Sequence, residues 1–179
     1  MFKRIAALAL IILSLTLQAC ASDTAGLQAY ADNIDGYTFM YPNGWAPIKV
    51  PGSSDVVFHD LIEETENVSV VVSDISSDTQ LTDLGDPTKV ARTLLNSVIA
   101  PSQSGQEADL LAANSRSEED KVYYALEYTV DLPIGKRHNL STVVVRRGKL
   151  FTLSLSTPEV RWTKVEPIFH RVVDSFSVY

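Results

Sequence analysis

The chain has 179 residues, of which 15 are basic and 22 acidic, so its formal net charge is −7. A field of that sign repels nucleic acid and anionic lipid headgroups, and we expect neither as a partner. The length suits one domain with a self-sufficient core, and the single cysteine excludes an intramolecular disulfide.

The N-terminus has the layout of an export signal. Lys3 and Arg4 precede an uncharged, mostly apolar run over residues 5–17. These 13 residues, at a rise of about 1.5 Å each, reach only about 20 Å, which is short of the roughly 30 Å hydrocarbon core that a spanning helix must cross. Residues 1–19 are therefore predicted to be a signal peptide and not a permanent transmembrane helix.

The only cysteine, Cys20, directly follows Leu17-Gln18-Ala19, and this stretch resembles the lipobox of bacterial lipoproteins. In that family the thiol carries a diacylglyceryl group and the cysteine becomes the mature N-terminus. Two or three acyl chains anchor a protein stably, where one chain holds it only marginally. We predict lipid attachment at Cys20; the alternative is an ordinary cleaved signal with a chance cysteine. Without residues 1–19 the chain keeps 13 basic and 22 acidic residues, a formal charge of −9.

After the cysteine, the small and polar residues 20–35 are predicted to form a flexible tether, and residues 36–179 a single domain. Residues 36–41 alternate aromatic and other side chains, and the pair Asn43-Gly44 favours a tight turn. We expect a hairpin in which residues 45–50 return along the first strand.

The next two β-branched runs, residues 55–62 and 67–73, are separated by an acidic turn and predict a second hairpin. A helix follows, because Asp86 suits the N-cap and Pro87 suits the first helical position, where its missing N–H is not needed. Pro101 ends the helix, and its predicted apolar stripe consists of Val90, Leu94, Leu95 and Val98.

The last part of the chain is predicted to contain four strands and a closing helix. Period-two patterns place the strands at residues 108–115, 122–130, 140–145 and 151–156. Thr163 and Glu166 have the spacing of a capping box, with Pro167 in the first turn. The predicted buried face of the helix consists of Val165, Ile168, Phe169, Val172, Val173 and Phe176.

Short links between the predicted strands favour antiparallel hairpins over parallel winding, and two amphipathic helices must bury their apolar stripes. The fold class is therefore α+β, with helices flanking an antiparallel sheet.

Motifs of catalysis are missing from the sequence. It has no glycine-rich phosphate loop, no G-x-S-x-G elbow and no H-E-x-x-H helix, and no two of its three histidines stand at helical spacing. We therefore predict that the protein is not an enzyme, and we assign no catalytic residue and no required cofactor.

Metal binding is a second hypothesis. One imidazole with nearby carboxylates can bind zinc or manganese, and His59 and Asp60 stand just before Glu63 and Glu64. The candidate ligands are these four residues, to which we add the other two histidines, His138 and His170; calcium is a third candidate ion. The alternative is an exposed acidic turn beside a hydrogen-bonded histidine.

The basic residues gather in two clusters, Lys136 with Arg137 and Arg146 with Arg147 and Lys149. If residues 139–145 form a strand, the clusters lie about 30 Å apart at its opposite ends, at about 3.3 Å per residue. Either these cations dock an acidic partner, or they are solvated strand ends and a hairpin tip.

Five separated blocks of the sequence, taken together and in order, resemble the PsbP family, extrinsic subunits on the lumenal side of photosystem II. They are residues 36–45, 55–72, 121–130, 137–162 and 174–176. The lipobox matches the cyanobacterial branch of that family, whose members resemble lipoproteins of the thylakoid lumen.

The resemblance implies an α/β/α sandwich around an antiparallel sheet, no catalysis, and a role in assembling or stabilising photosystem II and its oxygen-evolving centre. It also implies a lipid-anchored monomer at the lumenal side of the thylakoid membrane, with photosystem II subunits as partners. Plant members carry an N-terminal extension tied to calcium and chloride retention; the short tether here favours an assembly or accessory role. The alternative is a lumenal metal-binding or ligand-delivery lipoprotein.

Overall fold

A computed structural model describes residues 25–50, 52 and 54–179. The predicted signal peptide, Cys20 and the first part of the predicted tether lie outside the described residues. Within the part of the chain that the structure describes, no helix is both long and apolar enough to span a bilayer.

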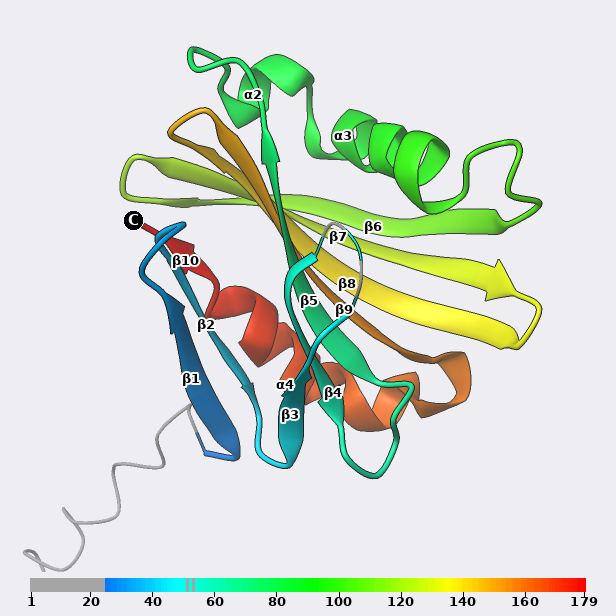
Figure 1. The fold of residues 1–179 in the computed structure, drawn as a ribbon. Helices are drawn as coiled ribbons and strands as arrows, with labels where there is room; N and C mark the ends of the chain where they lie inside the picture. The colour runs from blue at the N-terminus through cyan, green and yellow to red at the C-terminus, as the bar shows by residue number, and fades with distance from the viewer. Residues whose placement is uncertain (1–24, 51, 53) are drawn as a thin grey trace, which may run out of the picture.

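A seven-stranded sheet forms the centre of the molecule (Figure 1). Every neighbouring pair of strands is antiparallel, which confirms the predicted sheet type. In spatial order the strands are β3 (Trp45–Ile48), β4 (Ser54–Asp60), β5 (Asn67–Asp74), β9 (Lys149–Pro158), β8 (Gly135–Arg146), β7 (Lys121–Leu132) and β6 (Glu107–Glu118).

A second, three-stranded sheet consists of β1 (Leu27–Asp32), β2 (Tyr37–Pro42) and the short β10 (Ser177–Val178). This small sheet contradicts two predictions made from the sequence. Residues 27–32 do not belong to a flexible tether, because they pair with β2 along their whole length. The expected hairpin between residues 36–41 and 45–50 is wrong, because β2 and β3 belong to different sheets.

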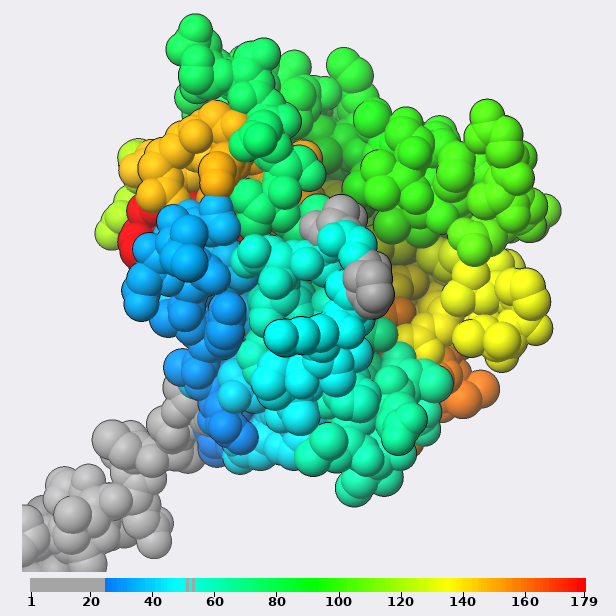
Figure 2. Space-filling view, in the orientation of Figure 1, coloured from blue at the N-terminus to red at the C-terminus, as the bar shows by residue number. Residues whose placement is uncertain are grey.

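Backbone hydrogen bonds at Asn43 and Gly44 explain the change of sheet. The Asn43 N–H donates to the Gly26 carbonyl over 2.9 Å, and the Gly44 carbonyl accepts from the Leu61 N–H over 3.2 Å. The turn is therefore shared between β1 on one side and the β4–β5 loop on the other. Figure 2 shows the start of β1, this turn and the β4–β5 loop together along the lower edge of the molecule.

Helices cover both faces of the large sheet, as the resemblance to the PsbP family implied. One face packs against α2 (Leu81–Leu84), α3 (Pro87–Leu94) and the π-helical turn η1 (Leu95–Ile99). The other face packs against α4 (Trp162–Asp174), which follows the 3-10 turn η2 (Glu159–Arg161), and against the small sheet. The result is an α/β/α sandwich with two hydrophobic cores.

The predicted faces of the long strands are confirmed. On β7, Tyr124, Leu126, Tyr128 and Val130 are buried beneath α2 and α3, with Val122 partly buried beside them. On β9, Phe151, Leu153 and Leu155 are buried in the core beneath α4. A strand alternates its side chains between the two faces, so both cores draw on the same strands.

Helix α3 begins as predicted and ends differently. The Asp86 side chain accepts a hydrogen bond from the Lys89 N–H, and Pro87 is the first helical residue. Val90 and Leu95 are buried, but Val98 is exposed, so its assignment to the apolar stripe is wrong. The Ala100 N–H donates a hydrogen bond to the Leu95 carbonyl five residues earlier, and in this wider turn Val98 lines an open apolar cavity over Val143 and Leu150 instead of packing against them.

Helix α4 begins one residue before Thr163, so the predicted capping box is wrong. Residue Arg161 at the N-cap makes no side-chain capping hydrogen bond, and Trp162 is the first helical residue. Burial of the Trp162 ring against the sheet winds residues 159–161 into η2 and moves the start of the helix. Pro167 is the sixth helical residue and lies in the second turn. The predicted buried face is confirmed, with Ile168 only partly buried.

Candidate functional site

The two predicted cationic clusters lie at opposite ends of β8, as the sequence indicated. Lys136 and Arg137 stand near its first residue, Gly135, and Arg146 is its last residue. Ten residues at about 3.3 Å each separate Lys136 from Arg146 by about 33 Å. We call the two ends of the large sheet the Arg137 end and the Arg146 end.

At the Arg146 end the cations are paired with acidic groups of the domain itself. Arg146 Nη1 lies 2.8 Å from Asp120 Oδ2, and Lys149 Nζ lies 2.5 Å from Asp35 Oδ1. The Arg147 guanidinium donates to the Asp35 carbonyl over 2.6 Å. The hydrogen bond from Arg146 lowers the pKa of Asp120, and the hydrogen bond to Asp35 raises the pKa of Lys149.

Both ion pairs are partly accessible to water, and water and salt screen such pairs, so they contribute little to stability. Arg146 and Lys149 can therefore exchange their present carboxylates for those of a partner with little loss. The Arg146 end is chemically suited to a reversible acidic contact.

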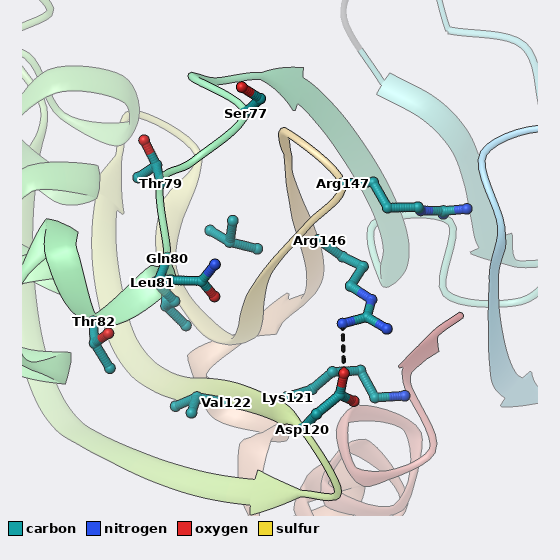
Figure 3. Close-up of a pocket in the computed structure, with 11 residues that line it drawn as sticks. Ser77, Thr79, Gln80, Leu81, Thr82, Asp120, Lys121, Val122, Arg146 and Arg147 are labelled. Carbon is teal, nitrogen blue, oxygen red and sulfur yellow. Dashed lines mark hydrogen bonds and ion pairs between the residues drawn. The ribbon is translucent and has the colours of Figure 1, made fainter.

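A small polar pocket opens beside Arg146 (Figure 3). Its volume is about 110 Å³, so it can hold a single side chain or a few waters but not a drug-sized ligand. Figure 3 shows Arg146 directed to Asp120, whereas Arg147 points away from the segment that carries Thr79 and Thr82. The lining residues are Ser77, Thr79, Gln80, Leu81, Thr82, Asp120, Lys121, Val122, Val145, Arg146 and Arg147.

At the Arg137 end one predicted docking residue is not available. Arg137 is only 8% exposed, and its guanidinium donates to the Thr65 carbonyl over 2.5 Å and to Ser156 Oγ over 3.0 and 3.1 Å. Burial lowers the pKa of Arg137 despite the nearby Glu66 and Glu63. We correct the expectation of an exposed cation here: Arg137 ties β8 to β9 and to the β4–β5 loop. Lys136 remains exposed, 3.4 Å from Asp131.

A buried carboxylate, which the sequence did not indicate, lies beside Arg137. Glu66 is 2% exposed, and its Oε1 accepts from Thr157 Oγ1 over 2.8 Å and from Arg161 Nε over 2.6 Å. The hydrogen bond to Glu66 raises the pKa of Arg161. No local pattern could have revealed this pair, because 95 residues separate its members in the chain.

The first four candidate metal ligands follow one another on β4 and its loop. His59 and Asp60 are successive strand residues, so their side chains project from opposite faces. Asp60 accepts from the Trp45 indole over 2.9 Å and from the backbone N–H groups of Ile62 and Glu63 over 2.6 and 2.8 Å. Burial acts to raise the pKa of Asp60, but these hydrogen bonds outweigh it and lower the pKa. The Glu63 carboxylate accepts a hydrogen bond from the Thr65 hydroxyl, and Glu64 is exposed.

The other two histidines lie elsewhere. His138 on β8 has Nε2 2.9 Å from Glu127 and Nδ1 2.9 Å from Glu159, so both ring nitrogens are already engaged. His170 is exposed on α4. Among the described residues, no group of three or more His, Cys, Asp or Glu side chains has an arrangement that could hold a metal ion. The six candidate ligands are thus not brought together, and metal binding stays a prediction.

Comparison with known proteins agrees with the architecture. A profile described as PsbP matches residues 25–178. The chain is also 51% identical to CyanoP of Thermosynechococcus vestitus, over the full length of both proteins. The chain belongs to the PsbP family.

A second CyanoP and its solved structure confirm the fold and the branch of this PsbP-family protein. CyanoP of Synechocystis sp. is 48% identical over 94% of this chain and 93% of its own. The solution structure of that CyanoP superimposes with a TM-score of 0.75 over 87% of this chain and 94% of that chain. A chloroplast relative in Arabidopsis thaliana, PsbP-like protein 1, is 37% identical over 90% of this chain and 69% of its own.

Proposed function

We propose that this protein is an accessory protein of photosystem II, held at the lumenal side of the thylakoid membrane by acyl chains on Cys20. In this proposal it assists assembly or stabilisation of the complex and its oxygen-evolving centre by docking, without catalysis of its own. The observation that carries the proposal is the 51% identity to CyanoP over the whole length of both chains, which includes the segment around Cys20.

The surface chemistry supports docking through the Arg146 end. Its cations Arg146 and Lys149 lie in solvent-accessible ion pairs that can exchange partners, while Arg137 at the other end is buried and hydrogen-bonded within the fold. Electrostatic contacts of this kind contribute more to the association rate and to specificity than to raw affinity. The partner surface is therefore an acidic lumenal patch, and the association weakens as salt rises.

Crosslinking with mass spectrometry on intact thylakoid membranes tests the proposal. The expected crosslinks join the Arg146 end to photosystem II subunits, and a protein absent from photosystem II in crosslinked membranes would refute it. A relative in Arabidopsis, 28% identical over 83% of this chain, is named a lumenal subunit of the photosynthetic NDH complex. Crosslinks to that complex instead would replace photosystem II as the partner.

Charge reversal identifies the docking end. The double variant Arg146→Glu and Arg147→Glu should reduce recovery of photosystem II with the protein several-fold. The matched control is Lys136→Glu with Lys164→Glu, which changes the net charge by the same amount on residues away from the Arg146 end. An equal reduction in photosystem II recovery for the two double variants would show that the net charge of the protein, and not the Arg146 end, determines the association.

A further inference from the structure

Exposed aliphatic side chains gather at the Arg137 end of the sheet. Ile62 is 96% exposed, and Leu61, Ile134 and Val160 are 61%, 82% and 90% exposed. They come from three loops: the β4–β5 loop, the β7–β8 turn, and η2 after β9. Protruding aliphatic side chains in adjacent loops are a feature of surfaces that meet another apolar phase.

The strand register places these loops along one edge. Asn67 stands opposite Ser156, Pro158 opposite Arg137, and Leu132 opposite Gly135, so the strands next to the three loops end or begin at the same end of the sheet. Neighbouring strands lie about 4.8 Å apart, so the β4–β5 loop and the β7–β8 turn are about three strand spacings, or 14 Å, from each other. Between Ile134 and Val160 the surface is hollowed into a groove of about 390 Å³.

The described chain begins at this same end. The Gly26 carbonyl accepts from the Asn43 N–H, and the adjacent Gly44 carbonyl accepts from the Leu61 N–H. Two backbone hydrogen bonds, made by the adjacent residues Asn43 and Gly44, therefore connect Gly26 to the exposed Leu61. In Figure 2 the blue start of β1 and the β4–β5 loop share the lower edge of the molecule.

The length of the preceding chain limits how far this end can lie from the anchor. Six residue steps join Cys20 to Gly26, and a fully extended chain covers at most about 3.6 Å per residue, or about 22 Å. The Arg146 end is farther by the length of β8, about 36 Å for its 12 residues. With acyl chains on Cys20, Gly26 stays within about 22 Å of the bilayer in every orientation of the domain.

We propose that the Arg137 end is the membrane-facing surface of the domain, and that Leu61, Ile62, Ile134 and Val160 enter the bilayer interface. This inference rests on the lipid anchor of the proposed function. The anchor supplies the attachment, and the four aliphatic side chains set the orientation by leaving water for the region between headgroups and acyl chains. Because Glu63 and Glu64 follow Ile62 directly, the surface suits lipids without net negative charge.

The orientation has a consequence for docking. With the Arg137 end on the bilayer, Arg146, Arg147 and Lys149 lie about 33 Å farther from it, at the opposite end of β8. The two ends of one strand thus face two different partners, lipid and protein.

Depth-dependent quenching tests the proposal in the acylated, full mature chain. Since Cys20 is the only natural cysteine and its sulfur carries the diacylglyceryl group in the anchored protein, an introduced cysteine is the only free thiol. Ile62→Cys is labelled with an environment-sensitive fluorophore, and the protein is placed in phosphatidylcholine vesicles with brominated acyl chains. Ile34→Cys is the matched control, because Ile34 is 94% exposed and lies next to Asp35, which pairs with Lys149 at the Arg146 end.

The expected result is at least twofold quenching and a blue shift at Ile62, with no quenching at Ile34. No quenching at Ile62, or equal quenching at both sites, overturns the proposal. An Ile62 label that is shielded only in native thylakoid membranes would assign this surface to a protein and also overturn it. Mass spectrometry of the N-terminal peptide distinguishes failure of the lipid anchor from failure of the orientation. An unmodified Cys20 refutes the anchor, whereas a lipidated Cys20 without quenching at Ile62 refutes only the orientation.

Discussion

The imidazole of His138 lies flat on the indole of Trp162, with ring centroids 3.7 Å apart and planes 8° from parallel. The two ring nitrogens of His138 face Glu127 and Glu159, both at 2.9 Å. The stacked imidazole therefore joins β7, β8 and η2 to the first turn of α4 through two hydrogen bonds and one ring contact.

Replacing His138 by Ala should lower the free energy of unfolding by about 2 to 3 kcal/mol, because a buried ring and two hydrogen bonds are lost together. His138→Phe keeps the stacked ring without the hydrogen bonds and should lose less. Urea denaturation of the three proteins measures both effects. A change below about 0.5 kcal/mol in His138→Ala, the range of ordinary surface substitutions, would show that this cluster does not support the fold.

A second prediction concerns the ion pair between the buried Glu66 and the partly exposed Arg161. Arg161→Met leaves the Glu66 carboxylate, 2% exposed, with only Thr157 as a side-chain donor, and should lower the free energy of unfolding by about 2 to 3 kcal/mol. Adding Glu66→Gln removes the uncompensated charge and should recover part of that loss. A double-mutant cycle measures the coupling, and strictly additive effects would contradict a direct ionic interaction.

How much of the fold could be predicted from the sequence depended on how far apart in the chain the interacting residues are. The buried faces of β7 and β9 were predictable, because side-chain alternation is a local property of an extended chain. The α3 N-cap was predictable for the same reason, since Asp86 and Lys89 are three residues apart. The change of sheet at Asn43 was not, because it depends on a distant partner, Gly26, that competes with the local turn preference.

The same distinction applies to the candidate sites. The number of residues between the two cationic clusters correctly placed them at opposite ends of β8. It could not show that Arg137 is buried, because its partners Thr65 and Ser156 belong to other strands and loops. For the metal hypothesis, nearness in sequence did not become nearness in space, since His59 and Asp60 project from opposite faces of β4.

A third prediction concerns Gly36, whose backbone has φ of +77°. An added Cβ would lie 2.6 Å from Arg147 Nη2, so the Arg147 guanidinium would have to move, and we expect it to lose its hydrogen bond to the Asp35 carbonyl. Gly36→Ala should therefore destabilise the protein more than Gly44→Ala. Gly44 has φ of +87° but no atom within 4 Å of an added Cβ.

Backbone strain alone accounts for about 1 to 2 kcal/mol at each glycine, and the lost hydrogen bond adds about 1 kcal/mol at Gly36. Thermal and urea unfolding of both variants give the difference. In the background of Arg147→Ala the excess at Gly36 should vanish; an excess that persists there would mean that crowding by Arg147 is not its cause.

A fourth prediction concerns Asp60 and pH. The hydrogen bonds from Trp45, Ile62 and Glu63 lower the pKa of Asp60 in the folded protein, while the unfolded chain keeps a value of about 3.9. Between the two values the unfolded state binds more protons, so stability rises with pH there. The contribution of Asp60 is complete above the unfolded pKa and is lost as the pH falls through the folded pKa.

The difference in free energy of unfolding between the wild type and Asp60→Asn should therefore be constant above about pH 5 and shrink below about pH 3.9. Urea denaturation at pH 3 to 7 measures it, and Glu64→Gln in the same loop is the matched control for the loss of one negative charge. A difference that grows on acidification would mean that the folded state raises the pKa of Asp60, which would contradict the hydrogen bonds that hold this loop.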